Sequence, residues 1–161
     1  MAKDLNKALE AVEMTYGQIK QIADDMVAAP FAEVNRLYEE VSLRVDMLSI
    51  EALREYLLKL QLAAFGLSEM RDRAGAKATC AEAVRKEAYA VSYASQEGTA
   101  AAKDSATTLA IAENIVAQCL YDLVAALVKT KLDSTHRLID TLKSILMSRM
   151  QEAKMSNSML D

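Results

Sequence analysis

The chain of 161 residues has a helix-favouring composition with four glycines and one proline, so few turns and long helices are expected. No segment reaches the roughly 20 consecutive apolar residues that a membrane span requires, which excludes a transmembrane protein. The net charge is −4 and aromatic residues make up 5%, so a lone bundle would bury few large side chains, and burial between subunits is favoured.

Three helices are expected in the first part of the chain. The first spans residues 2–28 and carries one apolar stripe at three- and four-residue steps. Pro30 is expected to end it, because a proline pushes the preceding residue out of the helical region. The second helix is expected at residues 31–47. Ser49 is the expected N-cap of the third, which is expected to end near residue 65.

The third expected helix carries a second apolar stripe, made of Leu58, Leu62 and Phe65, beside its inner face. This stripe is interpreted either as ordinary core or as a subunit contact, and the pattern leaves both open. The segment between Gly66 and Gly75 either continues this helix or opens the next one.

The second part of the chain predicts two helices joined by one turn. Residues 76–95 have a helical pattern, and Gly98 is a C-terminal stop, which places a turn at Ser95–Thr99. The last helix is expected over residues 100–154, which contain no glycine or proline. At 1.5 Å per residue it is longer than a small domain is wide, and the preceding helix reaches about half as far.

The uncovered length of the last helix predicts packing against other copies of the chain. The fold expected is an all-α helical bundle with a long C-terminal helix, coiled-coil-like packing and an oligomeric state. The expected oligomer interface consists of Leu120, Leu123, Leu127, Leu138, Leu142 and Ile145.

Charge divides the chain into expected parts. Residues 1–66 carry seven basic and eleven acidic groups and are interpreted as an acidic helical module. Residues 67–154 are expected to form a helical hairpin, and residues 155–161 a disordered tail. Residues 129–154 carry six basic and three acidic groups, which form either a solvated face or, repeated in several subunits, a basic track.

No constellation predicts catalysis. His136 is the single histidine and lacks the ligand spacing of a metal site. Cys80 and Cys119 are interpreted as small buried thiols in a reducing compartment. With no glycine-rich phosphate loop, no catalytic residue, metal or cofactor is expected. An enzyme that depends on His136 is kept only as a residual hypothesis.

One helical segment combines basic and aromatic residues. Arg85, Lys86 and Tyr89 lie within about one turn, and Tyr93 continues their face. Cations that meet phosphates beside rings that stack on bases suit single-stranded nucleic acid. The alternative interpretation is a salt-bridged surface with tyrosines partly in the core.

A resemblance to a known family covers about residues 70–150. It is carried by Lys77-Ala78, Glu82, Arg85-Lys86-Glu87-Ala88-Tyr89-Ala90, Tyr93, Glu97-Gly98-Thr99 and, at the end of a long helix, Leu142-Lys143-Ser144-Ile145. This pattern resembles phage recombination mediators of the UvsY type. The resemblance implies a ring-forming protein that binds single-stranded DNA and helps load a RecA-like recombinase. It implies DNA contacts at Arg85 and Lys86, with Lys77 and Lys103 nearby.

Two functions are therefore expected as alternatives. The first is a phage recombination accessory protein that binds single-stranded DNA as a homo-oligomer, with nucleic-acid contacts at Arg85, Lys86, Tyr89, Lys77 and Lys103. The second is a non-enzymatic protein-interaction module, such as a phage assembly factor or an inhibitor of a host protein. Neither involves a membrane or a small-molecule substrate. The expected location is the cytoplasm, that of the host if the protein is phage-encoded.

Overall fold

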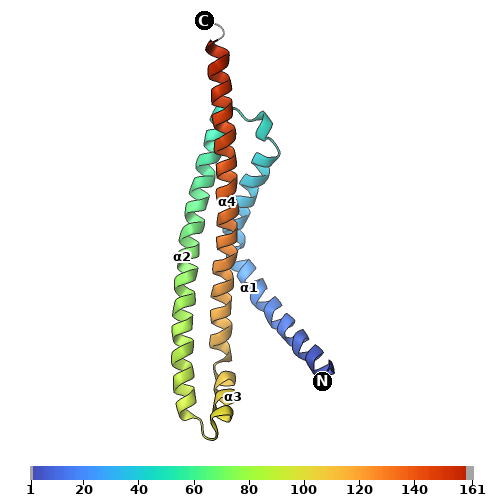
Figure 1. Cartoon of the computed structure of the whole chain (residues 1–161), viewed down its shortest axis with the longest axis vertical. Coiled ribbons are helices and arrows are strands. Elements are labelled where there is room, and N and C mark those ends of the chain that lie inside the picture. The colour runs from blue at the N-terminus through green and yellow to red at the C-terminus, as the bar shows by residue number, and fades with distance from the viewer. Residues whose placement is uncertain (1, 159–161) are drawn as a thin grey trace. The chain divides into compact units, whose positions relative to one another are not determined.

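The computed structural model describes residues 2–158, with side chains from 12 to 155, and this part contains helices and no strand (Figure 1). The all-α fold predicted from the sequence is therefore confirmed. The elements are α1 (Ala2–Ser42), the 3-10 helix η1 (Val45–Met47), α2 (Ile50–Ser95), α3 (Ala100–Ala110) and α4 (Ala112–Ser158). Residues 155–158, expected in a disordered tail, are the last residues of α4, and residues 159–161 lie outside the described part.

The expectation that Pro30 ends the first helix is wrong, because α1 continues through this proline to Ser42. A proline inside a helix removes one hydrogen-bond donor and costs about 3 kcal/mol. Beyond it the helix buries Val34, Leu37 and Val41, each 3% exposed or less. Because each such side chain contributes about 1.5–3 kcal/mol, their burial offsets the cost of the proline.

The separate helix expected at residues 31–47 is also wrong, since this segment is the end of α1 followed by η1. The connection to α2 is tied to α4 by Arg149. Its guanidinium donates hydrogen bonds to the carbonyl oxygens of Val45, at 2.7 Å, and of Leu48. The carbonyl groups of this turn are thus paired by a side chain instead of by a helix.

Helix α2 begins at the predicted N-cap, where the Ala52 amide donates to the Ser49 hydroxyl at 3.1 Å. It then runs for 46 residues, so the expected end near residue 65 is wrong. Gly66 and Gly75 lie inside it, because a glycine costs a helix only about 1 kcal/mol relative to alanine.

The turn predicted at Ser95–Thr99 is confirmed, and it reverses the chain between α2 and α3 (Figure 1). Gly98 has φ of 111°, a backbone conformation that favours glycine. Thr99 then caps α3, and its hydroxyl accepts from the Ala102 amide at 3.4 Å.

The single helix expected over residues 100–154 is wrong, because α3 and α4 meet at Ile111 with a bend of 60°. Ile111 has φ of −103° and ψ of 14°, outside the helical region, and its side chain is buried. No glycine or proline marks this position, so hydrophobic spacing alone gave no sign of the break.

The chain forms two compact units, and each combines segments that are far apart in sequence. Unit 1 comprises residues 1–27 and 71–127, and unit 2 comprises residues 28–70 and 128–161. Helices α1, α2 and α4 contribute to both units. The organisation into residues 1–66 and 67–154 stays a prediction, and its boundary falls inside α2.

Unit 2 has the larger core among the described residues. Polar contacts also join its helices, since Tyr56 of α2 donates to Glu40 of α1 at 3.2 Å and Lys131 of α4 donates to Asn35 of α1. Its buried residues are Val34, Leu37, Val41, Leu53, Leu57, Leu60, Ala64, Leu67, Val128, Leu132, Thr135, Ile139 and Leu142. The buried residues of unit 1 are Ala23, Val27, Ala74, Thr107, Ile111 and Val124.

Candidate functional site

Two tyrosines and a lysine form a cluster near the α2–α3 turn of unit 1. The rings of Tyr89 and Tyr93 stack with centroids 5.8 Å apart and planes inclined by 18°. The Lys103 ammonium lies 5.8 Å from the centroid of Tyr93, and the Tyr89 hydroxyl donates to Asp104 at 2.5 Å. We call Tyr89, Tyr93, Lys103 and Asp104 the tyrosine–lysine cluster. Its aromatic faces and cation are the groups that single-stranded nucleic acids bind.

The other predicted nucleic-acid residues lie on α2 in the same unit, and each has a partner within the chain. Arg85 donates to Gln118 of α4 at 2.7 Å. Lys86 pairs with Glu82 one turn earlier, at 2.6 Å.

Lys77 is engaged as well, since its ammonium lies 5.3 Å from the centroid of the Tyr121 ring. The structure thus places all five predicted nucleic-acid residues in unit 1, while nucleic-acid binding itself stays a prediction. A phosphate at these cations would have to compete with the contacts that the chain already makes.

The same contacts change the acidity of their partners. The hydrogen bond to Asp104, together with desolvation, raises the pKa of Tyr89 above its ordinary value. The hydrogen bond from Lys86 lowers the pKa of Glu82. At neutral pH the cluster therefore presents a neutral phenol beside a carboxylate, which repels phosphate at its edge.

The predicted basic track of residues 129–154 is only partly available to a ligand. Arg149 is occupied by the two carbonyl groups near η1, and Lys143 lies 3.4 Å from Asp140. Burial lowers the pKa of Lys131, whose ammonium lies 5.7 Å from the centroid of Phe31.

The predicted oligomer interface is divided between the two units. Leu120, Leu123 and Leu127 are half-buried in unit 1, and Leu138 and Ile145 are half-buried in unit 2. Leu142 is fully buried in the core of unit 2, at 1% exposure. Whether these residues touch another subunit stays a prediction.

A clearer apolar surface lies on the outer face of α2 in unit 2. Leu58, Leu62 and Phe65 are 57%, 65% and 72% exposed, so the interpretation of this stripe as core is wrong. We call these three residues the α2 outer stripe. The inner face of the same helix is occupied by Leu53, Leu57, Leu60, Ala64 and Leu67, which are buried at alternating four- and three-residue steps. Helix α2 is therefore apolar on two opposite faces, of which the chain covers one.

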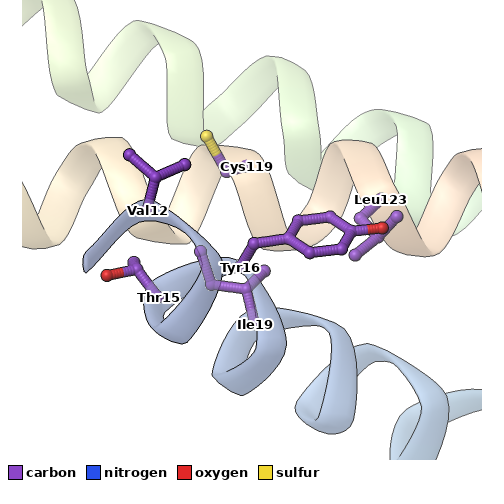
Figure 2. A pocket seen from close by; sticks show the side chains of 6 residues that line it. All are labelled: Val12, Thr15, Tyr16, Ile19, Cys119 and Leu123. Atoms are coloured by element: carbon purple, nitrogen blue, oxygen red, sulfur yellow. The ribbon is translucent and has the colours of Figure 1, made fainter. Parts of the chain in front are cut away.

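An open apolar groove lies between α1 and α4 within unit 1 (Figure 2). It has a volume of about 470 Å³, and Figure 2 shows the Tyr16 ring directed from α1 toward Leu123 of α4. Its lining residues are Val12, Thr15, Tyr16, Ile19, Cys119 and Leu123. Hydrophobic spacing missed this groove, since it predicts one apolar stripe along α1 but not how far its partner helix covers that stripe.

The interpretation of the two cysteines as buried thiols is wrong, because Cys80 and Cys119 are both exposed. Their alanine-rich surroundings indicated burial, but small residues also occupy the outer faces of these long helices.

The residues that the structure describes contain no group of three or more His, Cys, Asp or Glu that could hold a metal ion. His136 is exposed on α4 and lines an open pocket together with Ser68, Asp140 and Phe65.

No protein-family model, curated protein or solved structure matches the chain. In residues 2–158 no single helix is long and apolar enough to cross a membrane, although α3 and α4 taken as one bent pair meet that criterion of length and composition.

Proposed function

We propose that this chain is a non-enzymatic helical protein that binds macromolecules and assembles with copies of itself. The observation that carries the proposal is the exposure of large apolar side chains in rows along the helices. Among the described residues, seventeen large hydrophobic residues are exposed, as many as the hydrophobic residues that are buried. Isolated apolar residues are normal on a protein surface, but a row such as the α2 outer stripe is typical of a binding surface.

Assembly is tested by measuring the mass in solution with light scattering over a wide range of protein concentration. The expected mass rises above the 17.7 kDa of one chain as the concentration increases. A mass that stays at one chain throughout the range contradicts the proposal.

A second candidate function is single-stranded DNA binding in support of a RecA-like recombinase, favoured by the tyrosine–lysine cluster. Stacked Tyr89 and Tyr93 present aromatic faces beside Lys103, and base–aromatic stacking contributes about 1–3 kcal/mol per base. We place this function second because the net charge is −4 and the nearby cations have partners within the chain.

The second candidate is tested by the fluorescence anisotropy of a labelled single-stranded oligonucleotide. Binding is expected to weaken steeply with salt, because phosphate contacts release counterions. Tyr93→Ala is expected to weaken binding at least fivefold, from the loss of about 1 kcal/mol or more of stacking. Tyr38→Ala is the control, since Tyr38 is an exposed tyrosine in unit 2. Absence of binding at low salt, or equal loss in both variants, contradicts this function.

A further inference from the structure

No contact or backbone conformation in the described part of the chain requires a glycine at position 66. Gly66 lies inside α2 one turn after Leu62, at i+4, so it adjoins Leu62 on the surface of the helix at one side of the α2 outer stripe. It is exposed, a Cβ added to it would meet no atom within 4 Å, and its φ is not positive. Alanine would fit there and would stabilise the helix by about 1 kcal/mol.

A glycine on an outer helix face allows another backbone to approach closely. We propose that the outer face of α2 in unit 2 is a self-association surface, on which two copies of α2 cross antiparallel. Leu62 of each copy packs over the partner's Gly66, and Leu58 and Phe65 cover the flanks of the contact. The inference rests on the proposed function, which it deepens by naming the surface and the occupant.

Charge on the same face selects the antiparallel arrangement. Pairing residue 62 with the partner's residue 66 centres the contact on position 64, which also brings Lys59 opposite the partner's Glu69. Because a twofold axis relates the two copies, this opposite-charge pair forms twice. In a parallel pair Glu55, Lys59 and Glu69 would each lie opposite the same residue of the other copy. Like charges would therefore meet at all three positions. Within its own chain the Lys59 ammonium pairs with Glu55 at 2.7 Å and lies 5.6 Å from the centroid of the Tyr56 ring, so the contact with the partner's Glu69 would add to these exposed interactions.

The contact is small, and its size sets the expected affinity. Three large side chains per copy bury less than the about 800 Å² per partner that stable complexes reach. The dimer is therefore expected to be weak, with Kd in the micromolar range or above. A second copy of the chain nevertheless fits this surface. In an isologous contact the same surface supplies both the apolar residue, Leu62, and the glycine over which the partner's Leu62 packs, Gly66.

Sedimentation equilibrium on the full chain tests the surface. Leu62→Gln is expected to raise the dimer Kd at least tenfold, with little effect on folding because Leu62 is exposed. Leu109→Gln is the control, since Leu109 is also an exposed leucine, on α3, and it should leave Kd unchanged.

The two helical glycines give a second, sharper comparison. Gly66→Ala and Gly75→Ala should both raise the melting temperature, because in each case the added methyl group meets no atom of the chain. Only Gly66→Ala should also raise Kd several-fold. A Gly66→Ala chain that is more stable and dimerises as well as the wild type overturns the close-approach argument.

Orientation is read from mixed disulfides in a background with Cys80→Ala and Cys119→Ala. An equal mixture of Lys59→Cys and Glu69→Cys chains should give mainly the 59–69 cross-link, and a dominant 59–59 cross-link overturns the antiparallel arrangement.

The failures of the two proposals are distinguishable. If the wild-type chain is monomeric at every concentration, both the proposed function and the proposed surface are contradicted. A wild type that assembles while Leu62→Gln assembles equally well keeps the proposed function and removes this surface. If the stripe binds a different protein, the chain alone gives one of these two results, and each of them removes the stripe as a self-association surface.

Discussion

Thr107 is fully buried in α3, and its Oγ1 has no hydrogen-bond partner in the part of the chain that the structure describes. A buried hydroxyl without a partner costs about 1–3 kcal/mol. Thr107→Val replaces the hydroxyl with a methyl group of similar shape, so it is expected to raise the free energy of unfolding by about 1 kcal/mol. Urea denaturation, read as a shift of the midpoint at constant slope, measures this change.

Thr135 provides the control for Thr107. It is also buried, but its Oγ1 donates to the Lys131 carbonyl oxygen at 2.8 Å. Thr135→Val loses a satisfied hydrogen bond and is expected to give no gain. Equal gains in both variants would show that the effect comes from valine itself and not from the unpaired hydroxyl.

The hydrogen bond between Tyr89 and Asp104 gives unit 1 a dependence on alkaline pH. Because it raises the pKa of Tyr89 above the unfolded value of about 10, it contributes stability that is complete below that pH. This contribution is lost as the pH rises through the folded pKa. In an alkaline absorbance titration, Asp104→Ala is expected to move the ionisation of one tyrosine to lower pH. An unchanged titration curve would contradict the role of this hydrogen bond.

Local signals in the sequence predicted single residues well where the structure depends on neighbours in the chain. Ser49 as a helix cap and Gly98 as a stop are both confirmed, because a cap and a left-handed turn involve only a few adjacent residues. The burial of Cys80 and Cys119 was predicted wrongly, because it depends on which helix face finds a partner elsewhere in the chain.

At the scale of elements, Pro30 inside α1 leads to a stability prediction. Pro30→Ala restores a backbone donor to the helix interior and removes the clash of the proline ring. We expect a gain of roughly 2 kcal/mol, since the cost of about 3 is reduced by about 1 for the greater freedom of the unfolded chain. Thermal unfolding followed by circular dichroism measures it. A lower melting temperature would mean that the proline conformation supports contacts that alanine loses.

The sequence predicted where helices exist better than where they end. Pro30, Gly66 and Gly75 each disfavour a continuing helix, yet their costs of about 1–3 kcal/mol are smaller than the free energy that the continuing helix gains from burial. Conversely, Ile111 ends a helix without any breaker residue. Tertiary packing decides both cases, and a one-dimensional pattern does not contain it.

At the scale of the whole molecule, the two units differ in the size of their cores. Thirteen residues are buried in unit 2 and six in unit 1 among those described, and three of the six are alanine or threonine. Amide hydrogens of α2 in residues 74–95 are therefore expected to exchange faster than those of α4 in residues 132–142. Hydrogen-exchange mass spectrometry measures this difference. Equal protection in the two segments would indicate that the units unfold together.

For the predicted nucleic-acid residues, too, the sequence indicates which residues share a helix but not which residues of other helices they contact. The five predicted nucleic-acid residues do share unit 1, because four of them lie on one helix and Lys103 follows the predicted turn. Their partners Gln118 and Tyr121 come from α4 and could not be identified by spacing.

The interleaving of the two units also bears on biosynthesis. Each unit needs part of α4, which begins at residue 112, so neither core can close before α4 starts to emerge from the ribosome; unit 1 needs the chain up to residue 127, and unit 2 needs the part of α4 that follows. Until then α1 and α2 emerge with apolar faces uncovered, on the α2 outer stripe and on the inner face alike. Nascent chains are therefore expected to bind a chaperone until α4 emerges, and slower translation should prolong that association.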